Sequence, residues 1–308
     1  AQAGIITDSS YTRARIIKIN TAKIRKELKQ KKIVIVAGFQ GVDLSKEITT
    51  LGRGGSDLTA VALAQALKAK SCEIYTDVEG IYTADPRFVS RARKLESISY
   101  DEMLEMASLG VQVLQTRCVE LAKRFDIPIV VRSSFTDKGG TMISPEVKAM
   151  EKVVVSAVTL NRNEAKITMR DVPDKPGVAA KIFKTIAGKG INVDMIVQNI
   201  SRTGYTDLSF TVLKENVAKT LRVARKTNGQ IGGGGVSADR DIARVSVVGV
   251  GMRSHSGIAA GMFEAMAESK INIEMISTSE ISISCVIGKK FARRAVRAIH
   301  KKFKLEKK

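Results

Sequence analysis

The second half of the chain contains an internal repeat, and this repeat restricts the fold more than any other feature of the sequence. The segment Gly177–Phe183 recurs as Gly257–Phe263, and Ile191–Ile196 recurs as Ile271–Ile276, each 80 positions later. Each copy is predicted to form a strand, a glycine loop, a helix, two strands and a second helix, which indicates a ferredoxin-like βαββαβ module. We expect the two modules to pair side by side, with the glycine-rich stretch Gly229–Gly235 as a flexible loop between them.

The first half is predicted to alternate between strands and helices, which favours a mainly parallel sheet covered by helices. The expected strands are Arg15–Ile19, Ile33–Phe39, Cys72–Thr76 and Pro128–Arg132, and the expected helices are Lys23–Gln30, Asp57–Lys68, Tyr100–Ala107 and Val111–Phe125. The continuous apolar run Ile33–Phe39 is typical of a buried strand. Ligands of such sheets bind beyond the carboxyl ends of the strands. One pocket is therefore expected to gather Arg53, Asp57, Thr76, Asp77, Tyr82 and Arg87.

A glycine-rich turn, Thr50–Asp57, lies between this predicted strand and an alanine- and leucine-rich helix. Glycines let backbone N–H groups approach an anion, and the start of a helix favours negative charge. Ser56 or Asp57 is the predicted N-cap, and Arg53 offers a planar fork for a carboxylate or a phosphate. The same pattern also fits an ordinary strand-to-helix turn with a solvated arginine, so both interpretations stay open at this point.

Composition narrows the class of protein. The 308 residues predict roughly two domains, and the apolar runs are too short to span a membrane. The net charge of +20 permits nucleic-acid binding, but the basic residues are dispersed and aromatic residues reach only 5%, so solvated helix faces explain the charge better. Cys72, Cys118 and Cys285 are predicted to be free thiols of a cytoplasmic protein. With only two histidines, no histidine or thiolate metal site is expected.

Together these motifs resemble one known family. Thr50–Asp57, Tyr75–Tyr82 and Ala84–Arg87 are similar to the C-terminal half of the kinase domain of aspartate kinases, and the two repeats resemble the tandem ACT domains of that family. The resemblance runs from Gln2 to about Leu305. It implies an α/β fold with part of an amino-acid-kinase-type parallel sheet in residues 1–148, followed by ACT modules in residues 161–235 and 236–308. A strand within residues 152–160 is a candidate to join the second module.

The resemblance implies that a phosphoryl group passes from ATP to the β-carboxylate of L-aspartate, the first step towards lysine, threonine and methionine. Arg53 then pairs with a carboxylate of aspartate, and Asp57 orients the family's catalytic lysine. The residues implied for aspartate are Arg53, Gly54, Gly55 and Ser56, and those implied for the nucleotide are Thr76, Asp77, Tyr82, Arg87 and Gln112. Because a carboxylate is already a nucleophile, catalysis rests on positioning and on charge neutralisation by Mg²⁺ and cations. A turn cap at Asp77 and a core position for Tyr82 are the structural alternatives.

The chain departs from the family pattern at two places. The family begins with a strand and a Lys-Phe/Tyr-Gly-Gly-Thr-Ser segment that supplies the catalytic lysine, and this segment is absent here. We therefore expect that the N-terminal part of the kinase domain is missing and that the chain does not catalyse alone. Secondly, Gln112 stands where the family usually has a lysine for the ATP phosphates, and a neutral amide does not supply that charge. The alternative function is a non-catalytic amino-acid-sensing chain that retains half a kinase domain.

The regulatory residues are implied in the same way. In the family, lysine, threonine or both bind where the first ACT module of one chain meets the second module of another. The matching residues are Asp174, Gly177, Ala179, Asn192, Val193, Asp194, Gln198 and Ser201, with Asn272, Ile273, Thr278 and Ser279 in the second module. The asparagines also fit simple turn chemistry, and Asp174 suits a lysine ammonium without deciding between the two effectors. The expected assembly is a homodimer through the ACT domains or, if Met150 begins a separate regulatory subunit, an α2β2 enzyme.

Overall fold

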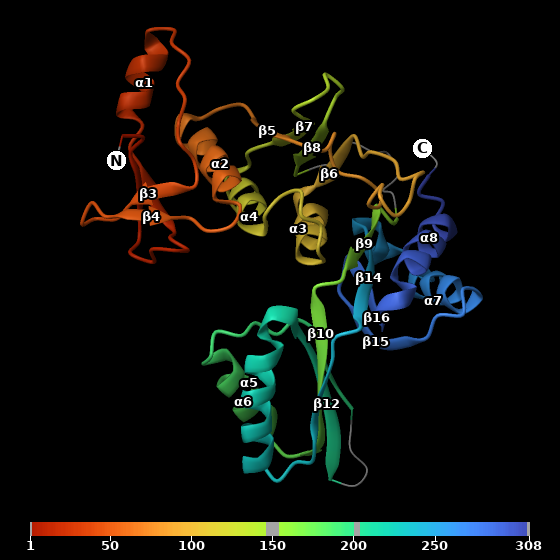
Figure 1. Ribbon diagram of the computed structural model, residues 1–308. Helices are drawn as coiled ribbons and strands as arrows, with labels where there is room; N and C mark the ends of the chain where they lie inside the picture. Colours follow the sequence, from red (N-terminus) through yellow and green to blue (C-terminus); the bar gives the residue numbers. More distant parts are fainter. Residues whose placement is uncertain (1, 146–153, 200–203, 307–308) are drawn as a thin grey trace. The chain divides into compact units, whose positions relative to one another are not determined.

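The computed structural model describes residues 2–145, 154–199 and 204–306. The chain divides into two compact units. The first comprises residues 1–157, 248–255 and 304–308, and the second comprises residues 158–247 and 256–303. Each unit has its own sheets and helices, most of which are labelled in Figure 1.

The first unit contains two four-stranded sheets of mixed direction, ordered β2-β1-β3-β4 and β5-β7-β8-β6. Their strands are β1 (Ile5–Thr7), β2 (Ile16–Ile19), β3 (Gln40–Val42), β4 (Ile48–Thr50), β5 (Cys72–Thr76), β6 (Ser97–Ser99), β7 (Ile129–Ser133) and β8 (Thr141–Ser144). β5 pairs in parallel with β7, and β6 with β8, whereas β7 and β8 are antiparallel. The predicted α/β class is confirmed, but its sheet is divided into two smaller mixed sheets.

Among the described residues of this unit, the sheets are accompanied by the helices α1 (Ala22–Lys29), α2 (Gly55–Leu67), α3 (Tyr100–Ser108) and α4 (Thr116–Phe125). The main core gathers the apolar sides of α2, α3 and α4 against β5 and β7, with Met103, Met106 and Ile129 fully buried. Helix α4 begins at Thr116 and not at Val111 as predicted, because residues 111–115 form an irregular segment that inserts Leu114 into this core.

The predicted strand Ile33–Phe39 is wrong. No strand of the described residues pairs with this segment, and Ile33 and Ile35 are each 94% exposed. Val34 and Val36 lie on the opposite side of the segment and line a cavity against α1 and α2. A run that is apolar on both faces belongs in the middle of a covered sheet. The segment therefore has the composition of a central strand without the neighbours that would make it one.

The second unit contains two modules, each with a four-stranded sheet. The first sheet, ordered β11-β12-β10-β13, consists of β10 (Glu164–Pro173), β11 (Ile196–Gln198), β12 (Tyr205–Leu213) and β13 (Val236–Asp239). The second sheet, ordered β15-β16-β14-β9, consists of β9 (Ala157–Asn161), β14 (Ile242–Val248), β15 (Ile273–Thr278) and β16 (Ser282–Gly288). The helices are α5 (Val178–Ala187) and α6 (Val217–Gln230) in the first module, and α7 (Ile258–Glu268) and α8 (Ala292–Lys302) in the second (Figure 1).

Strand pairing changes two expectations, the boundary after Gly235 and the flexible loop between the modules, and it places β9, from the candidate region 152–160, in the second module. The edge strand next to β14 in the second module's sheet is β9, although β9 precedes the first module in the sequence. Strand β13 pairs with β10, so Val236–Asp239 belongs to the first module's sheet, and a boundary after Gly235 falls too early. The glycine stretch 229–235 therefore lies inside the first module. It is also held in place, because Asn228 Nδ2 donates to Gly234 O at 2.7 Å and Gly234 N donates to Arg170 O at 2.9 Å.

Candidate functional site

The glycine-rich turn enters α2 two residues earlier than predicted. The N-cap is Gly54, with a left-handed backbone at φ 71°, and not Ser56 or Asp57. A Cβ atom on Gly54 would overlap the side chain of Gln115, and one on Gly55 would lie 2.9 Å from a ring carbon of Phe39. Both glycines are thus required by close packing and, at Gly54, by the backbone angle. The result is a close-packed turn that leads directly into α2, with Gly55 N donating to Gly52 O at 2.9 Å.

Arg117 holds this turn from the neighbouring helix, and sequence reasoning did not single it out. Its Nη1 donates to Leu51 O at 2.7 Å, and its Nη2 donates to Ala14 O at 3.0 Å. The planar guanidinium suits two carbonyls that converge in this way. The sequence offers no local signal for this contact, because Arg117 and Leu51 are 66 residues apart.

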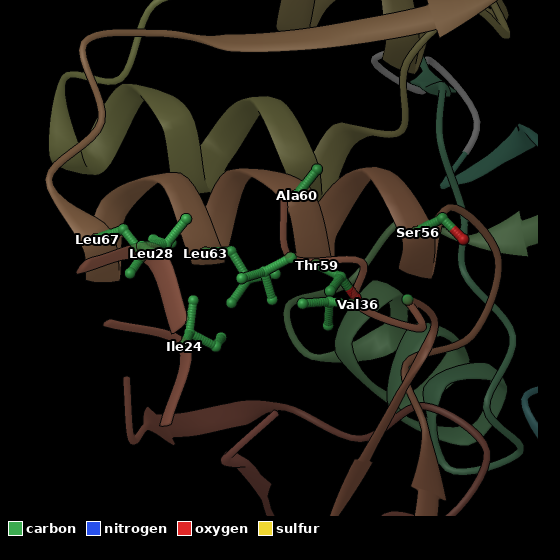
Figure 2. Close-up of a pocket in the computed structure, with 10 residues that line it drawn as sticks. Ile24, Leu28, Val36, Ser56, Thr59, Ala60, Leu63 and Leu67 are labelled. Carbon is green, nitrogen blue, oxygen red and sulfur yellow. The ribbon is translucent and has the colours of Figure 1, made fainter. Parts of the chain in front are cut away.

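The residues implied for aspartate do not share one environment. Arg53 is exposed, whereas Asp57 is half-buried in the first turn of α2, and this burial raises the pKa of its carboxyl group. Ser56 lines a cavity of about 530 Å³ together with apolar residues of α1, α2 and the 34–38 segment. Figure 2 shows Leu63, Thr59 and Val36 of this cavity pointing toward one another, with Leu28 and Leu67 at one end and Ser56 at the other. The lining is mainly apolar and does not include Arg53 or Asp57.

Three of the nucleotide residues lie around the end of β5. Thr76 Oγ1 donates to Asp77 Oδ1 at 3.0 Å. Arg87 forms a two-pronged ion pair with Asp85, with Nη2 to Oδ2 at 2.7 Å, and its own pKa is raised by Asp85 and, more weakly, by Asp77. The guanidinium is largely exposed, since 84% of its side-chain surface is accessible. Thr76 and Asp77 therefore form a polar pair at the carboxyl end of a parallel strand, where such sheets bind their ligands, and Arg87 is near enough to Asp77 to interact with it electrostatically.

Tyr82 and Gln112 are the other two residues implied for the nucleotide. The Tyr82 hydroxyl donates to Glu79 at 3.4 Å, and Glu79 also pairs with Lys138 at 2.9 Å. Partial burial and the neighbouring Glu79 raise the pKa of Tyr82. Gln112 is exposed in the irregular segment before α4, and not on a helix as expected. Within the described ranges, no three His, Cys, Asp or Glu side chains come together in a way that could hold a metal ion.

In the first module, four residues implied for the effector line one cavity of about 290 Å³. They are Asp174, Gly177, Ala179 and Gln198, and the remaining lining comes from the same loop, from the end of β10 and from Leu208. Gly177 is the N-cap of α5 with φ 90°, so its left-handed backbone turns the loop into the helix. The cavity thus places a carboxylate and an amide side chain beside the positive end of a helix.

The other first-module residues are scattered. Asn192 is exposed and Val193 packs against the module core, so neither lines this cavity. Asp194 pairs with Arg244 of the second module, with Oδ2 to Nη1 at 2.6 Å, while Arg244 Nη2 binds Glu164 at 2.6 Å. Arg244 and Glu164 are each 3% exposed, so a buried ion pair joins the two modules. Ser201 and Met150 lie outside the described residues.

The second-module residues lie on and beside the edge strand β15. Asn272 precedes the strand, Ile273 begins it and Thr278 ends it. Ser279 follows in the turn, where its hydroxyl and that of Ser282 are 2.9 Å apart. Strand β15 lies at the edge of the second module's sheet, and β11 lies at the corresponding edge of the first module's sheet.

The sequence is similar to two families of known domains. Residues 1–133 match the amino acid kinase family, and residues 167–227 and 245–303 match the ACT domain. Among curated proteins, an aspartate kinase of Pseudomonas fluorescens is 54% identical over 307 residues, which cover 99% of this chain and 74% of that relative. No helix of the described residues is long and apolar enough to cross a membrane.

Solved structures agree with this similarity. Aspartokinase III of E. coli in complex with aspartate and ADP, in its R-state, has a TM-score of 0.79 at 28% identity, covering 98% of this chain and 68% of the other. The same enzyme in complex with lysine and aspartate, in its T-state, has a TM-score of 0.73 at 28% identity and the same coverage. The similarity thus spans both the kinase part of the chain, which contains the match at residues 1–133, and the regulatory part, which contains the ACT matches at residues 167–227 and 245–303.

Proposed function

Because this chain belongs to the aspartate kinase family, we propose that it binds L-aspartate and ATP in its first unit and an amino-acid effector, lysine or threonine, in its second. The reaction is transfer of the γ-phosphoryl group to the β-carboxylate of aspartate. Such a transfer needs charge neutralisation and alignment more than a base. Its place at the start of lysine, threonine and methionine synthesis is part of the same proposal, as is a cytoplasmic location, which the three buried free cysteines support.

Arg53 and the Gly54 turn carry the aspartate part of the proposal. The exposed guanidinium of Arg53 pairs with a carboxylate of the substrate, while the N–H groups at the start of α2 stabilise negative charge. Asp57 stands in the first turn of the same helix. Its proposed role is to orient the catalytic lysine of the family, which belongs to the segment that is absent from this sequence. Arg117 keeps the turn in place through the carbonyl of Leu51. A loss of Arg117 is therefore expected to act through the turn and not through substrate contact.

The polar group at the end of β5 carries the nucleotide part. Thr76, Asp77 and Tyr82 hold the nucleotide, and Arg87 exchanges its bond with Asp85 for the phosphates. Asp77 with the Thr76 hydroxyl offers oxygen donors of the kind that suit Mg²⁺, which kinases bind through one or two carboxylates together with the phosphates. Mg²⁺ supplies neutralisation of phosphate charge when it is bound with ATP. The residues of this chain position the nucleotide and the acceptor.

The 290 Å³ cavity in the first module is the single observation that carries the regulatory part. Its helix start suits the α-carboxylate of an amino acid, and the Asp174 carboxylate suits an ammonium group. The volume is about that of a small ligand site. The opposite wall is proposed to come from strand β15 of a second copy, with Asn272, Ile273, Thr278 and Ser279, in a homodimer; an α2β2 assembly is the alternative.

Isothermal titration of the purified chain with L-lysine, L-threonine, both together, and Mg-ATP tests the proposal. Saturable binding of lysine or threonine, abolished by Asp174→Ala and retained by Glu215→Gln, supports the assigned cavity. Glu215 is exposed on the same module but does not line the cavity, so its variant controls for loss of surface charge. Binding of neither amino acid contradicts the regulatory part. Amino-acid binding without Mg-ATP binding favours the alternative of a non-catalytic sensing chain, which the exposed, neutral Gln112 supports.

A further inference from the structure

The loop that follows β14 is the second module's counterpart of the cavity-lining loop, yet it packs differently. Residues 248–255 form one compact unit with the kinase part of the chain. Ser156 N donates to Val248 O at 2.7 Å, and Val248 is buried in the same core cluster as Met103 of α3. A Cβ atom on Gly249 would overlap Val154 O and lie 2.9 Å from Val155 Cα. The backbone at Gly249 therefore lies against the segment that leads into β9, without room for a side chain, while Val248 reaches the core around α3.

A buried carboxylate reaches this loop from helix α3. Glu102 is 3% exposed and lies in the first turn of α3, where it forms a capping box with Ser99. Its Oε2 accepts from Ser99 Oγ at 2.7 Å and from Ser99 N at 3.2 Å. Its Oε1 accepts from Ser156 Oγ at 2.5 Å and from Val250 N at 3.2 Å. One side chain thus satisfies four donors, two at its own helix start and two outside it.

Capping of α3 alone does not require the negative charge of the Glu102 carboxylate. A glutamine serves in a capping box as well as a glutamate, because one side-chain oxygen is enough for the N-cap N–H group. Here the second oxygen is engaged by Ser156 and by the loop at Val250. A glutamine has a single acceptor oxygen, so it could satisfy either the cap or the loop but not both. Only a carboxylate joins α3 to the loop while it keeps the cap.

We infer that Glu102 is the positioning residue that couples the second module's loop to the kinase helix α3, an inference that rests on the proposed effector regulation. The loop continues directly from β14, and β14 carries Arg244, which binds Asp194 and Glu164 of the first module. On the other side, α3 packs on α4, and Arg117 of α4 holds the turn at Leu51. A movement of the first module relative to β14 therefore reaches the aspartate-binding turn through contiguous contacts, with Glu102 as the link between the regulatory and the catalytic part.

Hydrogen exchange with mass spectrometry on the full chain tests this link with two matched variants. Glu102→Gln keeps the size of the side chain and loses one acceptor. Asp101→Asn removes a carboxylate from the same helix turn, with its exposed pair to Lys123, but touches neither Ser156 nor Val250. Without any amino acid, Glu102→Gln should speed exchange in residues 250–255 about tenfold, as expected for the loss of one charged hydrogen bond, and Asp101→Asn should leave it unchanged.

Exchange is then measured again with saturating L-lysine or L-threonine, whose binding to each variant is followed by calorimetry. In the wild type, the amino acid should alter exchange across α3, and in Glu102→Gln it should bind while exchange across α3 stays unchanged. A merely structural role would not separate binding from this response. The coupling is overturned if α3 of Glu102→Gln still responds, or if residues 250–255 exchange as in the wild type.

Binding of neither amino acid by the wild type would instead refute the proposed regulation, and the exchange of residues 250–255 without amino acid would then decide on the link alone. If Glu102→Gln fails to fold, Ser156→Ala replaces it, because this variant keeps the carboxylate and removes one donor to the same oxygen. It is expected to shift exchange in residues 250–255 in the same direction by a smaller factor. An unchanged rate in Ser156→Ala would count against the link.

Discussion

The sheets of the two repeat modules have equivalent strand orders, β11-β12-β10-β13 and β15-β16-β14-β9, but their loops face different surroundings. In the first module, the loop before α5 lines a 290 Å³ cavity. In the second module, the corresponding loop before α7 begins against the kinase part and receives a carboxylate from Glu102. Both helices still begin at a left-handed glycine, Gly177 with φ 90° and Gly257 with φ 91°. A duplicated module can thus keep its backbone while one copy provides a binding cavity and the other a connection.

Among the substitutions considered, loss of the Arg244 ion pairs between the two modules should cause the largest loss of stability. At pH 8, where Glu164 is ionised, Arg244→Met leaves its buried carboxylate without this cation, and breaking a buried ion pair costs about 3 to 5 kcal/mol. Lys166→Met is the matched control, because the Lys166–Glu274 pair also joins the modules but is partly exposed, and such pairs contribute about 1 kcal/mol or less. Scanning calorimetry of both variants checks the difference. Equal losses would mean that the modules are not held together mainly through Arg244.

Glu164, the buried acidic partner of Arg244, should make the stability of the protein depend on pH. Burial raises the pKa of Glu164 to about 7 from its usual 4.5, against the opposing effect of Arg244. The folded state therefore binds the proton more tightly than the unfolded state. Stability from this group is complete below about pH 4.5 and is lost as the pH rises to about 7, by up to about 3 kcal/mol.

Denaturant unfolding of the wild type and Glu164→Gln at pH 5 and pH 8 measures this effect. The variant cannot titrate at this position, so the wild type should lose more stability than the variant between the two pH values. A difference that is the same at both pH values would show that Glu164 keeps an ordinary pKa.

The contact between the second loop and the segment before β9 can be tested by adding one methyl group. Gly249→Ala places a Cβ atom against the backbone of Val154 and Val155, and such overpacking costs about 1 to 3 kcal/mol. Gly235→Ala in the first module meets no atom within 4 Å, so it should be nearly neutral. Thermal unfolding of both variants compares them. A neutral Gly249→Ala would contradict the close approach of this loop.

The smallest loss of stability is expected at the left-handed glycine that begins the first helix of each module, Gly177 or Gly257. Gly177→Ala and Gly257→Ala each put a side chain at a left-handed backbone position with open space around it. Each should therefore cost about 1 kcal/mol through backbone strain alone. Thermal unfolding should give the same loss for both. A clearly larger loss at Gly257 would mean that the second helix start is packed as tightly as Gly249.

Local patterns predicted what local forces determine. Strand Cys72–Thr76 was predicted with the bounds it has, and the repeat predicted the two modules, because alternation and glycine loops are properties of short segments. The segment Ile33–Phe39 was predicted wrongly, because a strand exists only with neighbours that the sequence pattern does not reveal. The Gly54 cap was missed because Ser56 and Asp57 are stronger capping residues by composition.

Contacts between distant residues were beyond such reasoning. Arg117 and Leu51 are 66 residues apart, and Glu102 and Val250 are 148 residues apart. Arg117 and Glu102 stand in helical sequences where a charged residue is ordinarily a solvated surface position. Their roles follow only from the fold, which brings a carbonyl or an N–H group to each of them. Asp174, Gly177 and Ala179 were accessible to sequence reasoning because they lie close together at the loop and helix start, whereas Gln198 on β11 came only from the family resemblance.

The most direct test of the account is hydrogen exchange of the wild-type chain with and without saturating L-lysine or L-threonine, compared between the two corresponding loops. We expect the strongest slowing of exchange in residues 174–182, around the first-module cavity, and a smaller change in residues 249–258. The strongest slowing in residues 249–258, with residues 174–182 unchanged, would contradict it, because the second module would then be the sensor.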